Sequence, residues 1–172
     1  MSKPALSLRA PVLLAQRHDL KCFASGEQVL DDWLQQRALA NLENGASRGY
    51  VVCLAGEERV VGYYALAMGQ VLNREVPGGM RRNMPAKIPA VMLGRLAVDK
   101  TLQGRGLGVS LLRDAVVRSL RAAQAIAARL MIVHAISPAA EAFYLHHGFA
   151  RIGGEAPALA LDLVKMKALS SG

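Results

Sequence analysis

The chain has 172 residues, of which 52% are hydrophobic and 20% are charged. This length suits one domain over residues 1–172, and the composition can fill a buried core, which excludes an intrinsically disordered chain. The net charge of +8 favours a polyanionic partner, although a basic surface that serves only solubility has the same composition.

Hydrophobic spacing and turn residues predict a strand, a helix and a hairpin in the first half of the chain. Residues 8–14 are expected to form a strand. Ser25–Gln28 resembles a capping box, and a mostly apolar stripe at helical spacing follows it until Asn44–Gly45. The stripe consists of Leu30, Trp33, Leu34, Arg37, Ala38, Asn41 and Leu42. Residues 50–54 and 60–71 then predict two strands that form a hairpin.

The second half predicts strands and helices that follow one another. Prolines and glycines indicate a surface loop over residues 77–89, and residues 91–98 predict a buried strand before a glycine-rich turn and a long helix. The remaining predicted elements are a strand at 130–134, a helix at 138–147 and a terminal strand at 159–166. Hairpin and crossover connections together predict an α/β fold of the α+β mixed kind, a central mixed sheet flanked by helices.

Cysteine content and apolar stretches indicate a cytoplasmic protein. Cys22 and Cys53 are too few for a secreted disulfide framework, so we expect free thiols and no metal site. Arg9 interrupts the N-terminal apolar stretch, and Arg129 interrupts the apolar stretch of residues 122–135. We therefore expect neither a signal peptide nor a membrane segment.

A glycine loop, Gln103-Gly104-Arg105-Gly106-Leu107-Gly108, follows a predicted strand and opens a predicted helix. Such a junction gathers free backbone N–H groups and the positive end of a helix dipole, which together bind phosphate. Glycine permits positive φ angles and close approach of a ligand. The spacing matches neither a P-loop nor a dinucleotide fingerprint. A tight turn before a well-packed helix is the structural alternative.

The stretch from Leu96 to Gly108 resembles the acetyl-CoA signature of the GNAT acetyltransferase superfamily, in which Arg or Gln precedes two spaced glycines; Gln103, Gly106 and Gly108 match it. A second block of the family, a tyrosine followed by Gly-Phe, is matched by Tyr144 and the residues after it. Many members have Asn seven residues before that tyrosine, where this chain has Ser137. The resemblance implies a single GNAT domain that binds acetyl-CoA through the glycine loop.

Four further segments resemble one subfamily, the GNAT toxins of bacterial toxin–antitoxin operons. These segments are Leu30–Leu34, Ser47–Val51, Gly62–Tyr64 and Leu93–Asp99. The resemblance implies acetylation of the α-amine of aminoacyl-tRNA, which stops translation, and it also implies a ribbon-helix-helix antitoxin and a homodimer.

By the same resemblance, Tyr144 is the expected catalytic residue, and the backbone of Leu96, Ala97 and Val98 is expected to hold the pantetheine arm and polarise the thioester carbonyl. A tyrosine hydroxyl can hydrogen-bond the departing sulfur and protonate it. An aminoacyl α-amine titrates near ~8, so it needs no strong general base. The alternative role of Tyr144 is aromatic packing.

Five basic residues are expected to contact tRNA phosphates: Arg48, Arg81, Arg82, Lys87 and Arg95. Only 5% of residues are aromatic, so recognition by charge and shape is expected rather than stacking on bases. Two other functions stay open. One is a GNAT enzyme that acetylates a protein or small-molecule amine, and the other is a non-catalytic acetyl-CoA-binding module. Salt-sensitive tRNA binding argues against the first, and acetyl transfer excludes the second.

Overall fold

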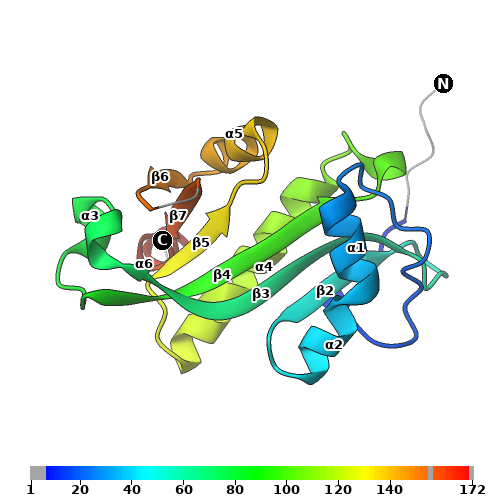
Figure 1. The fold of residues 1–172 in the computed structure, drawn as a ribbon, viewed down its shortest axis with the longest axis horizontal. Helices are drawn as coiled ribbons and strands as arrows, with labels where there is room; N and C mark the ends of the chain where they lie inside the picture. Colours follow the sequence, from blue (N-terminus) through cyan, green and yellow to red (C-terminus); the bar gives the residue numbers. More distant parts are fainter. Residues whose placement is uncertain (1–6, 155–156, 171–172) are drawn as a thin grey trace. The chain divides into compact units, whose positions relative to one another are not determined.

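The computed structural model describes residues 7–154 and 157–170 (Figure 1). Within these residues seven strands form one sheet in the order β1-β2-β3-β4-β5-β7-β6. The strands are β1 (Val12–Leu13), β2 (Arg48–Cys53), β3 (Val60–Leu72), β4 (Lys87–Val98), β5 (Leu130–His134), β6 (Ala150–Ile152) and β7 (Ala158–Asp162). The α-helices are α1 (Gln28–Gln36), α2 (Ala38–Glu43), α3 (Gly78–Arg81), α4 (Leu107–Ala125), α5 (Pro138–His146) and α6 (Leu163–Ser170). Two 3₁₀ turns are η1 (Asn73–Glu75) and η2 (Lys100–Leu102).

The sheet contains both kinds of strand pairing. β1, β2 and β3 pair antiparallel, β4 and β5 pair parallel, and β7 pairs antiparallel with both β5 and β6. This arrangement confirms the predicted mixed sheet and the β2–β3 hairpin. The described residues form two compact units, and long elements contribute to both: the first contains the chain up to Leu66 with Arg95–Asp114, and the second contains Ala67–Gly94 with the chain from Ala115.

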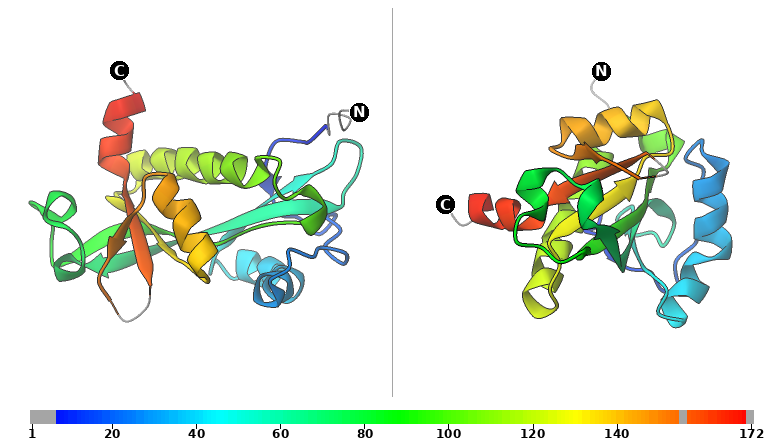
Figure 2. Two further views of the ribbon diagram at one scale, coloured as in Figure 1. Left: turned by 90° about the horizontal axis from the view of Figure 1, so that it is seen from above. Right: turned by 60° about the vertical axis from the view of Figure 1, so that its left-hand side comes forward.

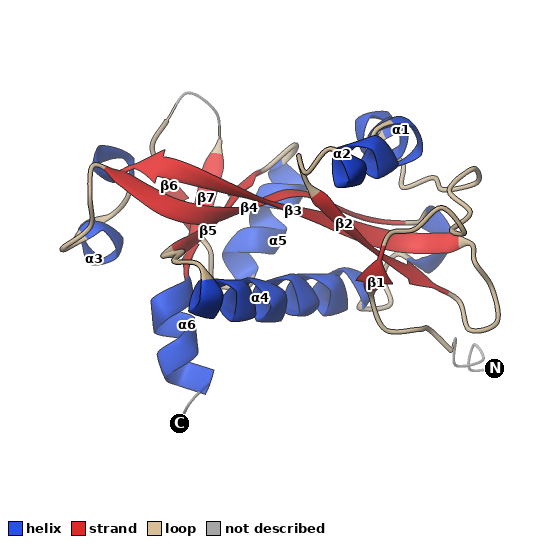
Figure 3. Cartoon of the chain, turned by 90° about the horizontal axis from the view of Figure 1, so that it is seen from below, coloured by secondary structure: helices blue, strands red, loops and turns tan. Residues whose placement is uncertain are grey.

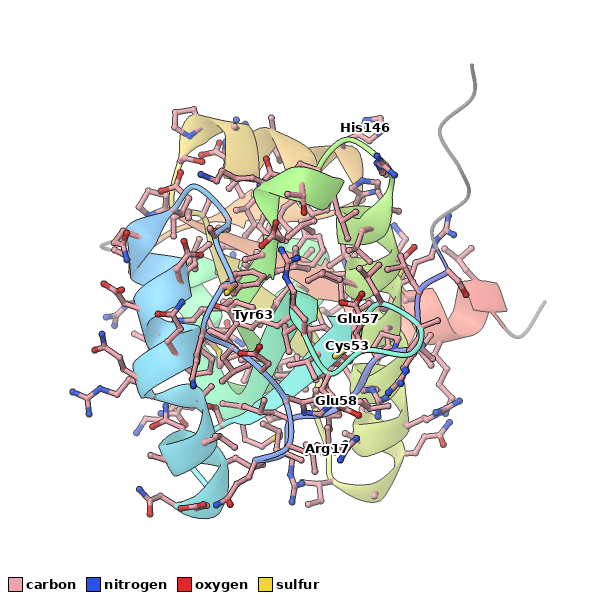
Figure 4. All side chains as sticks on the ribbon, turned by 90° about the vertical axis from the view of Figure 1, so that its right-hand side faces the viewer. Arg17, Cys53, Glu57, Glu58, Tyr63 and His146 are labelled. Carbon is pink, nitrogen blue, oxygen red and sulfur yellow. The ribbon has the colours of Figure 1, made fainter. Side chains whose placement is uncertain are left out.

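In the first unit, α1 and α2 pack their apolar side chains against one face of β2 and β3 (Figure 3). Tyr63 of β3 is fully buried beside α1 (Figure 4), stacks on Trp33 at a centroid distance of 5.9 Å and donates a 2.7 Å hydrogen bond to the Leu30 carbonyl. The first turns of α4 cover the other face, where a Cβ at Gly62 would lie 3.2 Å from Leu111. Gly62 therefore permits the close packing of α4 on β3.

In the second unit, α5 lies against β6 and β7 (Figure 2), and an apolar cluster fills the space beneath β5 and β7. Arg129, directly before β5, makes two hydrogen bonds of 3.1 and 2.9 Å to the carboxylate of Asp162 at the end of β7. The same carboxylate accepts the N–H groups of Val164 and Lys165. Asp162 therefore ends β7 and caps α6.

The predicted capping box at Ser25–Gln28 is wrong. Helix α1 begins at Gln28 with Glu27 as its N-cap, and no side chain caps it. The Ser25 hydroxyl donates instead to Asp31, at 2.6 Å. The single predicted helix is also divided, because Arg37 leaves helical geometry between α1 and α2. The predicted stop at Asn44–Gly45 is confirmed, since Gly45 has φ 74°.

Several predicted boundaries differ from the observed ones. The first strand is confined to β1, with Leu8 forming only an isolated bridge to Leu54. Strand β4 begins at Lys87 rather than residue 91, because the Pro89 carbonyl accepts the Arg129 N–H at 2.9 Å and keeps the proline within the sheet. The terminal strand ends at Asp162, where α6 begins. The short strand β6 was not predicted.

The segment over residues 77–89 is more ordered than a simple surface loop. It contains α3 and the start of β4. The side-chain amide of Asn73 donates to the carbonyls of Arg81, Met84 and Pro85, which fixes the path between these elements. Both cysteines are free, as predicted. Among the described helices, none combines the length and apolar character needed to cross a membrane.

Candidate active site

The glycine loop lies in the first unit and connects η2 to α4, which begins at Leu107. Gly104 and Gly106 have φ angles of 77° and 81°, a conformation that is costly for any residue with a Cβ. A Cβ at either position would meet no protein atom within 4 Å. The glycines are therefore needed for backbone conformation, and the space beside them is open to a ligand. The first-turn N–H groups of α4 have no intrahelical acceptor and point to this end of the helix.

Asp99 fixes the turn that leads into the glycine loop. One carboxylate oxygen accepts the Thr101 N–H at 3.0 Å and its hydroxyl at 2.7 Å, while the other accepts the Ala24 N–H at 3.1 Å. Burial alone would raise the pKa of Asp99, but these hydrogen bonds and the nearby Arg59 guanidinium outweigh it and lower the pKa. Asp99 is thus a charged, structural residue, and its role was not predicted from the sequence.

Gln103 uses its side chain within the protein. Its amide nitrogen donates to the Val98 carbonyl at 2.9 Å and to the Ser25 carbonyl at 2.7 Å. The side chain therefore holds the loop against the end of β4 and against the segment before α1. Gln103, Gly104, Arg105 and Gly106 are exposed residues.

Leu96, Ala97 and Val98 are the last residues of β4. Ala97 points into the apolar core of the first unit and is buried, whereas Leu96 and Val98 are half-buried. This alternation fixes the orientation of the strand, and the bond from Gln103 fixes the carbonyl of Val98. The predicted pantetheine strand is thus rigidly attached to the glycine loop.

Tyr144 lies in the second unit, on α5. Its side chain is buried against Phe143 and Phe149, with ring centroids 5.2 and 5.4 Å away. Burial raises the pKa of Tyr144 to about 12, so its hydroxyl keeps its proton at neutral pH. Helix α5 begins with a Ser137 cap, whose hydroxyl accepts the Ala140 N–H at 3.1 Å. Ser137, which stands where many GNAT members have Asn, therefore caps the helix.

The predicted phosphate-contacting residues lie in both units. Arg48 is exposed in the first, and Arg81, Arg82 and Lys87 are exposed in the second. Arg95 differs from them, because it is half-buried and its guanidinium lies 4.4 Å from the centroid of the Trp33 ring. This cation–π contact holds Arg95 beside α1.

The candidate functional residues are divided between the two units. The first brings together the glycine loop, the end of β4 and Arg95, while the second holds Tyr144. Sequence inspection missed Asp99 and the pair Ser25–Asp31; the signal for Asp99 was its position between a strand and a glycine loop. In the part of the chain that is described, no three His, Cys, Asp or Glu side chains are grouped to hold a metal ion.

Residues 46–151 match the acetyltransferase (GNAT) domain family, which covers more than half of the chain. The chain belongs to the GNAT acetyltransferases. The GNAT fold and the acetyltransferase activity expected from the two motif blocks are thereby confirmed, and the glycine loop and Tyr144 both lie within the matched region of this acetyltransferase.

Similar GNAT proteins include a tRNA-acetylating toxin from Mycobacterium tuberculosis (strain ATCC 25618 / H37Rv), 51% identical over 140 residues that span 81% of this chain and 83% of the relative. AtaT complexed with acetyl-methionyl-tRNAfMet is 29% identical and superposes with a TM-score of 0.89, covering 95% of this chain and 99% of AtaT. A mutant AtaT toxin bound to acetyl-CoA and to the C-terminus of the antitoxin AtaR is 28% identical, with a TM-score of 0.81 and coverages of 96% and 99%.

Proposed function

We propose that this acetyltransferase is the toxin of a toxin–antitoxin pair and transfers acetyl from acetyl-CoA to the α-amine of aminoacyl-tRNA, which blocks translation. The observation that carries the proposal is the 51% identity with the mycobacterial tRNA-acetylating toxin over most of both chains. The AtaT complexes with acetyl-methionyl-tRNAfMet and with acetyl-CoA support the same substrate and co-substrate.

Acetyl-CoA supplies the acetyl group as a thioester. The glycine loop suits its pyrophosphate, because Gly104 and Gly106 leave open space beside a helix N-terminus. The exposed Arg105 adds a positive charge to the same loop. The backbone of Leu96, Ala97 and Val98 orients the pantetheine arm and polarises the thioester carbonyl.

Tyr144 is the proposed catalytic residue. Its pKa of about 12 keeps the hydroxyl protonated, which makes it a permanent hydrogen-bond donor for the departing sulfur. Because a thiol titrates near ~8.5, outright proton transfer from Tyr144 is uphill. The hydroxyl therefore acts by donating a hydrogen bond that strengthens as charge develops on sulfur, and by relaying the proton released from the attacking nitrogen.

The attacking group needs little activation. An α-amine titrates near ~8 whereas a lysine amine titrates near ~10.4, so a much larger fraction of the α-amine is neutral at physiological pH. This difference favours aminoacyl-tRNA over lysine side chains as the acceptor. No dedicated general base is required in this mechanism.

Arg48, Arg81, Arg82, Lys87 and Arg95 are the proposed contacts to tRNA phosphates. The exposure of the first four and the net charge of +8 support this assignment. The proposal also includes a ribbon-helix-helix antitoxin, a homodimer, a single GNAT domain over residues 1–172 and a cytoplasmic location. The AtaT complex with the C-terminus of AtaR supports an antitoxin partner.

The decisive experiment incubates the purified protein with labelled acetyl-CoA and a total pool of charged tRNA. Label is expected in the RNA fraction, released by mild base together with the aminoacyl group. Uncharged tRNA is the control and is expected to take up no label. If the protein binds acetyl-CoA but labels only peptides or small amines, aminoacyl-tRNA is not its substrate.

A further inference from the structure

We propose that Asp31, on α1, positions the glycine loop for acetyl-CoA through Ser25 and Gln103. Asp31 belongs to none of the residues assigned to co-substrate, tRNA or catalysis above. The inference rests on the proposed function only in that the glycine loop binds acetyl-CoA. Asp31 is a positioning residue, because it acts through Ser25, whose main-chain carbonyl accepts a hydrogen bond from the Gln103 side chain.

The first step is the attachment of the glycine loop to the segment before α1. Both bonds of the Gln103 amide nitrogen are to carbonyls, one at Val98 and one at Ser25. The Ser25 carbonyl is therefore one of the two acceptors that hold the Gln103 side chain, and it ties the loop to the segment before α1. Without that acceptor, Gln103 retains only its bond to the end of β4.

The second step is the support of Ser25 by Asp31. The carboxylate accepts the Ser25 N–H at 3.0 and 3.1 Å and the Ser25 hydroxyl at 2.6 Å. Ser25 and Asp31 are 8% and 6% exposed, so water competes little for these bonds. Asp31 thus fixes both the main chain and the side chain of the residue whose carbonyl holds Gln103.

Helix capping does not explain this arrangement. The N-cap of α1 is Glu27, and Asp31 reaches back past the helix start to Ser25. The neighbouring residue supports the same conclusion: Ala24 donates to Asp99 at 3.1 Å and accepts the Lys100 N–H at 2.8 Å. The segment before α1 is therefore hydrogen-bonded through Ala24 to the turn at Asp99–Lys100 and through Ser25 to the glycine loop.

The test compares acetyl-CoA binding by wild type, Asp31→Asn and Asp32→Asn, using calorimetry without tRNA. Asp31→Asn places an N–H group where Ser25 needs an acceptor, so we expect the dissociation constant to rise about five- to tenfold. Asp32 is the matched control, because it lies on the same helix and accepts a hydrogen bond from the exposed Gln28 side chain, at 2.6 Å. Asp32→Asn is expected to bind as wild type does.

A double-mutant cycle with Gln103→Ala separates positioning from general destabilisation. If Asp31 acts through Gln103, then Asp31→Asn adds little to the loss already caused by Gln103→Ala. In steady-state assays KM for acetyl-CoA is expected to rise while kcat and KM for aminoacyl-tRNA stay within about twofold. Fully additive losses, or an unchanged dissociation constant in Asp31→Asn, would overturn the inference alone.

Absence of acetyl-CoA binding by wild type would overturn both the proposed function and this inference. The outcomes given above overturn only the inference, so failure of the inference can be told apart from failure of the proposed function. If Asp31→Asn does not fold, Ser25→Ala replaces it, since it removes the hydroxyl and keeps the Ser25 N–H. Ser25→Ala is then expected to raise the dissociation constant about threefold. An unchanged constant in that variant would count against the role of Asp31.

Discussion

Tyr144 is buried beside two aromatic rings, Phe143 and Phe149. Burial raises the pKa of its hydroxyl from 10 to about 12, which leaves the phenol a hydrogen-bond donor even at alkaline pH. Replacing Tyr144 by Phe removes the hydroxyl and preserves the packing, so we predict a fall in kcat of about 10²- to 10³-fold. The acetyl-CoA dissociation constant is expected to stay within about twofold. Initial rates with charged tRNA and calorimetry measure the two quantities, and a wild-type kcat in Tyr144→Phe would exclude a catalytic role.

His18 predicts how stability depends on pH. Its side chain is buried and its Nδ1 accepts the Ala15 N–H at 2.9 Å. Burial, with help from Arg17, lowers the pKa of His18, against an opposing effect of Glu58; Arg17 and Glu58 face each other 3.4 Å apart (Figure 4). As the pH falls below ~6.5, His18 binds a proton in the unfolded chain before it does so in the folded protein. The contribution of His18 to the free energy of unfolding is therefore fully present above that pH and declines below it.

The measurement for His18 is Tm between pH 7.5 and 5. Wild type is expected to lose stability progressively as the pH falls through this range. His18→Asn preserves an acceptor for the Ala15 N–H and removes the titrating group, so its Tm should depend less on pH. Parallel curves for the two proteins would assign the acid sensitivity to other residues.

At the level of elements, the glycine loop requires glycine for its backbone. We predict that Gly106→Ala, which forces a Cβ into φ 81°, costs about 1 to 2 kcal/mol in the free energy of unfolding or displaces the loop. Acetyl-CoA binding should weaken at least about tenfold. Gly78→Ala is the control, because Gly78 begins α3 with open space around it and needs no positive φ. Equal binding by both variants would refute the phosphate-binding role of the loop.

The junction of β7 and α6 depends on Asp162. Its carboxylate holds the mostly buried Arg129 and accepts two N–H groups of α6. We predict that Arg129→Ala leaves this carboxylate poorly paired and lowers the free energy of unfolding by about 3 kcal/mol. Urea unfolding measures the change. Arg151→Ala, which breaks the exposed pair with Glu141, should cost less than about 1 kcal/mol.

At the scale of the whole molecule, the net charge of +8 predicts a strong salt dependence of tRNA binding. Replacing Arg81 and Arg82 by Ala should reduce the slope of log K against log salt by about 2, since each phosphate contact contributes about 1. Arg37→Ala with Arg121→Ala changes the net charge equally, at exposed residues outside the proposed contacts. Equal slopes in the two double variants would show that tRNA binding depends on the total charge of the protein and not on contacts at Arg81 and Arg82.

Local patterns predicted much of the fold, and long-range bonds explain the rest. The β2–β3 hairpin and β5 follow from apolar spacing and turn residues, which act within a few positions. The end of β7 depends on Arg129, 33 positions before Asp162. Likewise, the sequence around Ser25 suggested a helix cap, but Ser25 forms hydrogen bonds with Asp31 and with Gln103, which lies 78 positions later in the sequence. The glycine loop could be recognised from the sequence because its motif is local. The residues that hold the loop in place could not, because their contacts join distant parts of the chain.

The two cysteines allow the protein to be observed without engineering. Cys22 is exposed, whereas Cys53 is buried, and burial raises the pKa of the Cys53 thiol. A maleimide dye will therefore react with Cys22 and spare Cys53. Cys22 lies two residues before Ala24, whose main chain is hydrogen-bonded to the turn that precedes the glycine loop. We expect the fluorescence of that single label to change when a ligand binds at the glycine loop, which stopped-flow mixing of the otherwise native protein would measure.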